Sequence, residues 1–182
     1  LSALAGQEVH PREEVSAAEL VERVVRGLEP RSGKQGPRIR VGEIGALRLM
    51  ADRIGLEQVL TNLVINALHA SQPHGVVSIG ARASSAGVEF TVADQGPGVP
   101  EALRARLFEP FFTTKGPGQG TGLGLAIAHA IVRGHGGTIA VEDGPGGRGA
   151  LFRVVLPHVP ADLPRAPVEA LPRPAGRRLL IV

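Results

Sequence analysis

The chain has 182 residues, of which 43% are hydrophobic and 20% charged, and its formal net charge is +3. A chain of this size and composition can bury one hydrophobic core, and the absence of cysteine excludes disulfides and thiolate metal sites. The absence of Trp and Tyr, together with scattered basic residues, argues against a nucleic-acid-binding surface.

The first predicted helix begins at Ser16, where Ser16 and Glu19 have the spacing of a capping box. Its apolar residues recur at helical spacing and define a face that we expect to be buried: Ala17, Leu20, Val21, Val24, Val25 and Leu28. Strands are predicted at residues 38–41 and 46–50. We assign residues 15–157 to one domain and residues 1–14 to the end of a preceding helix and a linker.

The second predicted helix follows Asp52, a residue type that caps helix N-termini well. Its predicted buried face consists of Leu56, Leu60, Leu63 and Ala67. Asn62 and Asn66 are four residues apart, so both amides lie on one stripe, with His69 near the same line. Asparagine is unfavourable inside a helix, and a single one usually faces solvent or caps a turn. A same-face pair also suits a hard cation that bridges phosphates, because an amide oxygen is a neutral Mg²⁺ ligand.

Strands are next predicted at residues 76–83 and 88–93, and the second runs into Asp94, Gly96 and Gly98. An acidic residue before a glycine turn is often only a turn former. The carboxylate can also accept a hydrogen bond from the exocyclic amine of adenine, and the two glycines let a base lie against the backbone. Both interpretations stay open at this point.

Three of the five phenylalanines lie together at Phe108, Phe111 and Phe112, shortly before Thr114 and Lys115. We expect them to anchor a mobile lid, residues 113–121, in the core. A glycine-spaced segment then leads into a helix predicted at residues 124–132: Gly120, Thr121, Gly122, Leu123, Gly124 and Leu125. Such glycines often form only a turn, but they also let the backbone approach a phosphate at the helix N-terminus.

The remaining predicted elements are a helix near residues 101–107 and strands at 138–142 and 151–156. Helices on one face of a mixed sheet make a two-layer α/β sandwich, which is an α+β fold. No apolar run approaches the roughly 18 residues of a membrane span, and no signal-peptide pattern is found. We therefore expect a cytoplasmic protein without membrane contact.

Four of these segments resemble, in order and spacing, the N, G1, F and G2 boxes of the catalytic ATP-binding domain of bacterial sensor histidine kinases. They are residues 62–66, 94–98, 108–115 and 120–125. The resemblance covers residues 15–157. It implies the Bergerat ATP-binding fold of the GHKL family, with ATP and Mg²⁺ as cofactors.

The resemblance also implies roles for single residues. Asn66 corresponds to the Mg²⁺ ligand, Asn62 to the neighbouring contact with phosphate and the metal shell, and Lys115 to a lid cation. These three are the expected catalytic residues, and Asp94 is the expected adenine anchor. Further nucleotide contacts are expected from Gly96, Gly98, Phe108, Thr114, Gly120, Thr121, Gly122, Leu123, Gly124 and Leu125.

Two positions depart from the family pattern. Many relatives have a threonine after residues 147–149 that helps to hold a water at the adenine, and this chain has Ala150. Many also have a basic residue three positions after the metal asparagine, where this chain has His69, which is only partly charged at neutral pH. These departures put the adenine-bound water and the strength of phosphate binding in question.

The resemblance implies a protein histidine kinase that passes the γ-phosphate of ATP to a histidine on a dimerisation domain. None of the six histidines has the expected setting, a helix with an acidic residue directly after the histidine. We therefore expect the acceptor outside this sequence, a homodimeric parent, and a response-regulator receiver domain as partner. Residues 1–14 then end the dimerisation helix, residues 158–176 form a proline-rich linker, and residues 177–182 resemble the start of a receiver domain, as in a hybrid kinase.

Two other functions are alternatives. One is a nucleotide-sensing module without catalysis. The other is an ATP hydrolase of the gyrase, heat-shock-chaperone or mismatch-repair type, which shares the fold. These hydrolases place a glutamate base four residues before the metal asparagine, where this chain has Asn62, and an amide cannot take a proton from water.

Overall fold

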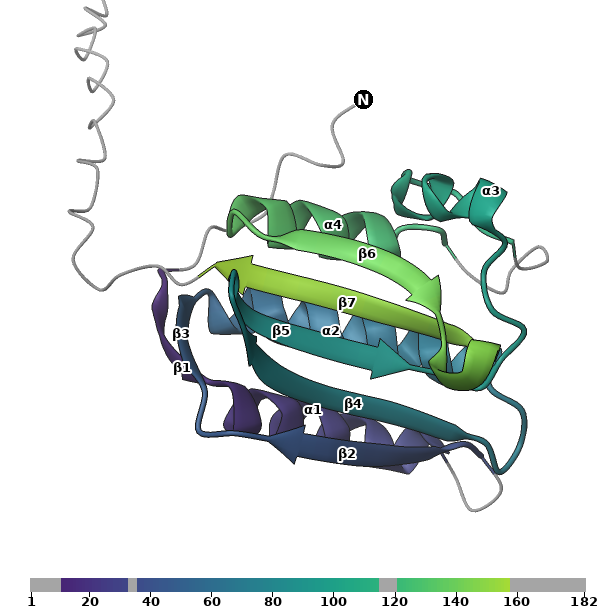
Figure 1. Ribbon diagram of the computed structural model, residues 1–182, viewed down its shortest axis with the longest axis horizontal. Coiled ribbons are helices and arrows are strands. Elements are labelled where there is room, and N and C mark those ends of the chain that lie inside the picture. Colours follow the sequence, from purple (N-terminus) through teal and green to yellow (C-terminus); the bar gives the residue numbers. More distant parts are fainter. Residues whose placement is uncertain (1–10, 33–35, 115–120, 158–182) are drawn as a thin grey trace, which may run out of the picture.

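The computed structural model describes residues 11–32, 36–114 and 121–157 and shows a mixed five-stranded sheet. The strand order is β2 (Arg38–Ile44), β4 (Val76–Ser84), β5 (Gly87–Ala93), β7 (Ala150–Pro157) and β6 (Thr138–Asp143). β2 and β4 are parallel, and the other neighbours are antiparallel. Helices α1 (Ala17–Ser32), α2 (Arg53–Ala70) and α4 (Gly124–Gly134) lie behind the sheet in Figure 1. The predicted two-layer α+β sandwich is therefore confirmed.

A second, two-stranded sheet begins the described chain. β1 (Glu13–Ser16) pairs antiparallel with β3 (Arg48–Ala51), and the chain enters α1 directly afterwards. Glu13 and Glu14, which the sequence interpretation assigned to a linker, lie in this strand instead. The reason is pairing with a segment more than thirty residues later, which no local pattern reveals.

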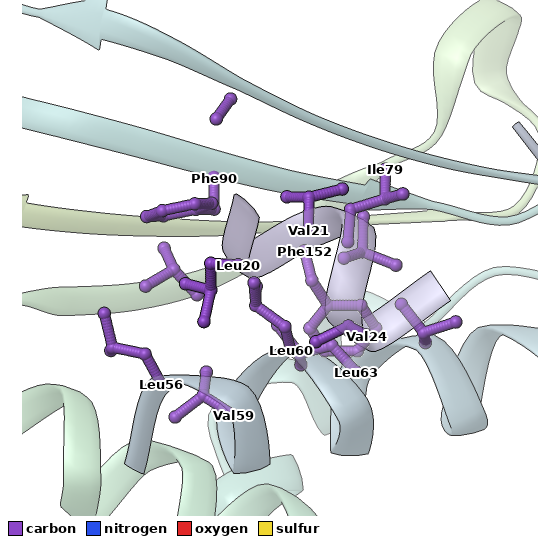
Figure 2. Close-up of a cluster of buried hydrophobic side chains, with 14 of the residues drawn as sticks. Leu20, Val21, Val24, Leu56, Val59, Leu60, Leu63, Ile79, Phe90 and Phe152 are labelled. Atoms are coloured by element: carbon purple, nitrogen blue, oxygen red, sulfur yellow. The ribbon is translucent and has the colours of Figure 1, made fainter. Parts of the chain in front are cut away.

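The hydrophobic core lies between the sheet and the helices (Figure 2). Alternating residues of three central strands face the helices and are buried: Val77, Ile79, Ala81, Val88, Phe90, Val92, Phe152, Val154 and Leu156. All six residues predicted to face inward on α1 are buried, and so are the four predicted on α2. This packing fixes α2 against the sheet, and the stripe with Asn62 and Asn66 is thereby fixed as well.

Both predicted helix starts are observed. The Ser16 hydroxyl accepts a hydrogen bond from Glu19 N–H at 3.4 Å, and the Asp52 carboxylate accepts one from Gly55 N–H at 3.0 Å. The predicted helix at 101–107 is broken into α3 (Glu101–Arg104) and a 3₁₀ turn at Arg106–Phe108. Neither piece has a buried residue, so no apolar face stabilises a longer helix there. None of the helices in the described ranges is long and apolar enough to cross a membrane.

The open face of the sheet carries a row of ion pairs across four strands. Glu89 on β5 accepts hydrogen bonds from Arg82 on β4 at 2.7 Å and from Arg153 on β7 at 2.8 Å. Arg153 also pairs with Glu142 on β6 at 2.9 Å. The Glu89 side chain is only 7% exposed because the two arginines cover it. The row ties β5, which ends directly before Asp94, to both of its neighbouring strands.

We predict that Glu89→Gln lowers the free energy of unfolding by about 1–2 kcal/mol at pH 7, since it removes the charge from two arginine hydrogen bonds. Burial alone raises the pKa of Glu89, but the hydrogen bonds from Arg82 and Arg153 outweigh it and hold the pKa below its usual 4.5. A depressed carboxyl pKa stabilises the fold above the unfolded-state value, and this contribution is lost as the pH falls through the folded-state pKa.

Urea unfolding at pH 7 and pH 3 tests this prediction. The difference in stability between wild type and Glu89→Gln should shrink at pH 3, whereas the exposed-pair variant Glu22→Gln should have little effect at either pH. A difference that stays constant between the two pH values contradicts the prediction.

Candidate functional site

Asp94 lies directly after β5 and is buried, with 4% of its surface exposed. Its Oδ1 atom accepts hydrogen bonds from Gly96 N–H at 2.8 Å and from Ala150 N–H at 3.2 Å. Its backbone N–H donates to Ala150 O at 3.0 Å. No cation in the described part of the chain pairs with this carboxylate, and its Oδ2 atom has no hydrogen bond there. A buried carboxylate held by backbone on one oxygen can accept a ligand's donor on the other.

Glycines allow the loops around Asp94 to pack backbone against backbone. A Cβ atom on Gly149, whose φ is +69°, would lie 1.9 Å from Asp94 O. On Gly98, with φ +78°, it would lie 3.0 Å from Gly149 O, and on Gly96 it would lie 2.6 Å from Ala70 O at the end of α2. The two predicted glycines therefore lie beside Asp94. We call the site formed by Asp94, Gly96, Gly98 and Gly149 the Asp94 corner. The sequence predicts no role for Gly149 itself, although residues 147–149 were identified as the glycine pair that precedes Ala150.

The two asparagines of α2 have different surroundings. Asn62 Nδ2 donates to Gly124 O at 3.0 Å, which joins α2 to the first residue of α4 and leaves Asn62 Oδ1 without a hydrogen bond in the described chain. Asn66 is half-buried, and its amide makes no hydrogen bond there. From Asn62 to Ala70 the helix rises about 12 Å. α2 therefore connects the start of α4 to the Asp94 corner over a length comparable to that of a nucleotide.

The segment before α4 is held by close backbone contacts. Gly122 has φ +66°, and a Cβ atom there would lie 2.5 Å from the carbonyl carbon of Phe111. Phe111 N–H donates to Gly122 O at 3.0 Å, and the Thr121 hydroxyl accepts from Leu123 N–H at 3.4 Å. The first N–H groups of a helix have no acceptor within the helix, so the start of α4 offers donors to an anion.

The sequence predicts that all three phenylalanines reach the core, but the structure shows that they do not. Phe108 is half-buried and stacks on His129 of α4 with the ring centroids 5.4 Å apart, and Phe112 lies under the guanidinium of Arg106 at 4.6 Å. Phe111 is 72% exposed and has φ +66°. The tight approach to Gly122 imposes this left-handed backbone conformation. We conclude that Phe111 is a surface residue beside the glycine segment.

Other predicted site residues are exposed or not described. Thr114 and Thr121 are exposed, Leu123 and Leu125 are half-buried near the start of α4, and His69 is exposed on α2. Lys115, Gly120 and most of the predicted lid lie outside the described residues. At Ala150 the backbone N–H, not a side chain, contacts Asp94, so the departure from the family pattern leaves the support of the carboxylate in place.

The side-chain oxygens on this part of α2 suit a hard cation that is bound together with a phosphate-bearing ligand. The described residues contain no group of three or more His, Cys, Asp or Glu that could hold a metal ion. The amide oxygens of Asn62 and Asn66 are the available protein ligands on this stripe of α2. Mg²⁺ accepts a few oxygen ligands from the protein and completes its shell with phosphates and water, so these residues fit Mg²⁺.

Comparisons with known proteins give concordant matches. The family described as histidine kinase-, DNA gyrase B-, and HSP90-like ATPase matches residues 51–160. The sensor histidine kinase ZraS of Escherichia coli (strain K12) is 47% identical over 109 residues, which are 60% of this chain and 23% of ZraS. The nucleotide-free catalytic domain of histidine kinase ThkA matches with TM-score 0.73 and 36% identity, covering 81% of this chain and 96% of that domain. Full-length ShkA in complex with AMPPNP matches with TM-score 0.72 and 33% identity over 84% and 32% of the two chains.

Proposed function

Because the chain belongs to the family of histidine kinase-, DNA gyrase B- and HSP90-like ATPases, we propose that it is the ATP-binding catalytic module of a two-component sensor histidine kinase. The observation that carries this proposal is the Asp94 carboxylate, which is buried, fixed on one oxygen by two backbone N–H groups and left with the other oxygen free. The only buried side-chain oxygen or nitrogen without a hydrogen-bond partner in the described residues is Ser71 Oγ, so the free Asp94 oxygen is open to solvent and a ligand's hydrogen-bond donor can reach it.

At the base end, Asp94 accepts a hydrogen bond from the exocyclic amine of adenine. Gly96 and Gly98 keep the surrounding loop close to the Asp94 corner. Guanine has a carbonyl oxygen where adenine has the amine, so it would place an acceptor against the carboxylate. Asp94 therefore selects ATP over GTP.

At the phosphate end, the segment Thr121 to Leu125 and the N-terminus of α4 hold the phosphates, with Phe108 supporting the approach. Thr114, Lys115 and Gly120 are further proposed nucleotide contacts. Asn66 is the protein ligand of Mg²⁺, and Asn62 contacts the phosphates and the metal's water shell. Bound Mg²⁺ would supply neutralisation of the phosphate charge. Lys115, Asn62 and Asn66 orient the γ-phosphate, because phosphoryl transfer depends on positioning and electrostatics.

The acceptor and the regulator are separate parts of the system. The chain spans 23% of ZraS, so the activity of a whole kinase is proposed here and depends on further domains. We propose a histidine on a dimerisation domain of the same homodimeric protein as acceptor and a receiver domain as the next partner. Exposed Phe111 beside the glycine segment supports docking of another domain next to the phosphates. Use of ATP favours a cytoplasmic location.

The two alternative functions, an ATP hydrolase and a nucleotide-sensing module, are distinguished from a kinase by the residue at position 62 and by phosphate transfer. An ATP hydrolase needs a base near the metal ligand, and Asn62 uses its amide to hold Gly124. Transfer to a supplied partner distinguishes a kinase from a nucleotide-sensing module. We expect labelled phosphate to move from [γ-³²P]ATP to an added dimerisation domain with its histidine, and none to a histidine-to-alanine version. ATP binding without any transfer would favour the sensing module.

Asn66→Ala should abolish the dependence of ATP affinity on Mg²⁺, because it removes the protein ligand of the metal. ADP without metal should bind almost as before, since the contacts of adenine with Asp94 are remote from this side chain. Calorimetric titration with and without Mg²⁺ measures both effects. Gln58→Ala, an exposed change on the same helix, is the matched control. Unchanged Mg²⁺ dependence in Asn66→Ala would place the metal ligand elsewhere.

A further inference from the structure

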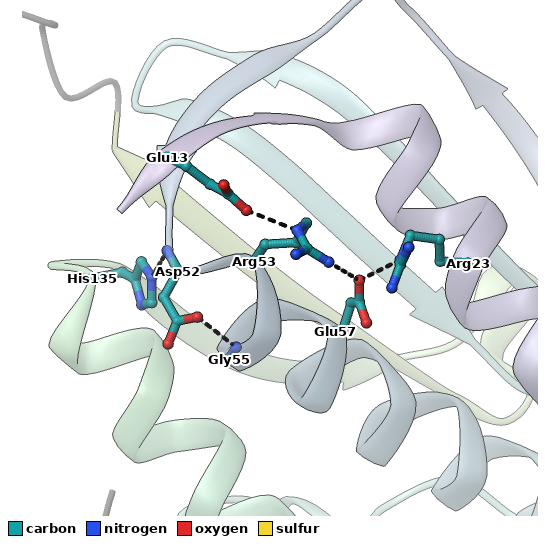
Figure 3. Close-up of polar contacts among 7 residues, drawn as sticks. All are labelled: Glu13, Arg23, Asp52, Arg53, Gly55, Glu57 and His135. Carbon is teal, nitrogen blue, oxygen red and sulfur yellow. Dashed lines mark hydrogen bonds and ion pairs between the residues drawn. The ribbon is translucent and has the colours of Figure 1, made fainter. Parts of the chain in front are cut away.

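His135 joins the end of one helix to the start of another. It follows α4 directly, and both of its ring nitrogens are engaged. Nδ1 lies 2.8 Å from Ile131 O, and Nε2 accepts a hydrogen bond from Asp52 N–H at 3.0 Å. Figure 3 shows the ring against Asp52, the N-cap residue of α2. Because Nε2 accepts, the proton of the neutral ring is on Nδ1, which donates to Ile131 O.

Helix α4 is thereby held against α2 at both of its own ends. The second fastening is the hydrogen bond from Asn62 to Gly124 O. Asp52 and Asn62 are ten residues apart, and Gly124 and His135 are eleven apart, so the fastenings are separated by about 15 Å along one helix and 17 Å along the other. Close packing accompanies the His135 contact, since a Cβ atom on Gly55 would lie 3.1 Å from Ile131 Cγ2.

We propose that His135 is a positioning residue for the nucleotide, acting through the angle of α4 against α2. This inference rests on the proposed function. The start of α4 presents the N–H groups to the phosphates, and α2 carries Asn62 and Asn66. With the His135 contact in place, the two helices hold these groups in one arrangement. Without it, α4 is free to pivot about the Asn62 contact, and the phosphate donors lose their alignment with the asparagines.

Protonation of the ring breaks the contact. A doubly protonated imidazole has no acceptor, so Nε2–H would face Asp52 N–H. The charged groups around the ring do not remove this conflict. The Asp52 carboxylate is engaged by Gly55 N–H, Arg12 donates to Gly134 O, and Arg53 pairs with Glu13 at 2.7 Å, while Arg133 is exposed on α4. Acid therefore favours the arrangement without the contact between His135 and Asp52. Nucleotide favours the arrangement in which His135 is neutral and the contact is made.

Two variants separate positioning from simple packing. In His135→Gln, the side-chain oxygen can reach the place of Nε2 and accept from Asp52 N–H, and it does not titrate. In His135→Asn, the shorter amide reaches only the place of Nδ1. We expect the affinity of the wild-type chain for Mg-ATP to fall about fivefold more than that of His135→Gln between pH 8 and pH 5.5. His135→Asn should bind about fivefold more weakly at both pH values. The γ-phosphate of ATP titrates in the same range, and His135→Gln corrects for that.

Linkage gives an independent readout on the wild-type chain. If neutral His135 goes with bound nucleotide, saturating Mg-ATP must shift the ring towards the neutral form by the same factor of about five by which protonation weakens nucleotide binding, because the coupling is reciprocal. Imidazole ¹⁵N NMR measures the fraction of neutral ring with and without Mg-ATP and shows directly whether Nδ1 carries the proton. Nucleotide binding with an unchanged His135 titration, or parallel pH curves for wild type and His135→Gln, would overturn the inference and leave the proposed function intact. No binding of ATP at any pH would overturn both.

Discussion

Gly149→Ala is expected to lower the free energy of unfolding by about 3–5 kcal/mol and to abolish ATP binding in whatever fraction still folds. The added Cβ atom would lie 1.9 Å from Asp94 O and 2.8 Å from Asp94 Oδ1, and the backbone there has φ +69°. Asp94 cannot easily yield, because the hydrogen bond from its N–H to Ala150 O directly continues the pairing of β5 with β7. The change therefore disrupts the backbone arrangement around Asp94 and does not only crowd it.

Gly146→Ala is the matched control for this effect. Gly146 lies in the same loop with φ +70°, but nothing is within 4 Å of its added Cβ atom. It should cost only the backbone strain of about 1–2 kcal/mol and leave ATP affinity unchanged. Urea unfolding and calorimetric titration of both variants separate strain from collision. Equal losses of stability in the two variants would show that the contact between Gly149 and Asp94 is not tight.

The elements predicted well from the sequence are those with local signals. α2 has its cap at Asp52 and its apolar period within one segment, so its start and buried face could be predicted before any tertiary contact was known. The same holds for α1. Asp94 with Gly96 and Gly98 could be identified as a candidate corner, because an acid and two glycines follow a strand directly.

What could not be predicted depends on residues far apart in the sequence. Ala150, which donates to the Asp94 carboxylate, is 56 residues away, and no local pattern pairs β5 with β7. The exposure of Phe111 follows from its backbone contact with Gly122, whereas hydrophobicity alone indicated burial. The role of His135 likewise requires knowing that Asp52, 83 residues earlier, lies beside it.

Asp94→Asn is expected to weaken ATP binding by about 2–3 kcal/mol, or roughly 30- to 150-fold, with little effect on folding. Oδ1 accepts two backbone hydrogen bonds, from Gly96 and Ala150, so the carbonyl oxygen of the new amide must take that place. The amide nitrogen then occupies the position of Oδ2. It would place a donor against the adenine amine, which is also a donor.

The same geometry predicts a change in nucleotide preference. An amide donor at that position suits the carbonyl oxygen of guanine, so the ratio of ATP to GTP affinity should fall by more than the loss of ATP affinity alone explains. Calorimetric titration of both nucleotides against wild type, Asp94→Asn and the exposed control Asp143→Asn measures this ratio. The control should behave as wild type, because Asp143 is 69% exposed and lies at the end of β6. Near-equal affinity of the wild-type chain for ATP and GTP would remove Asp94 from the role of adenine anchor. A uniform loss for both nucleotides in Asp94→Asn would show instead that the carboxylate supports the loop without reading the base.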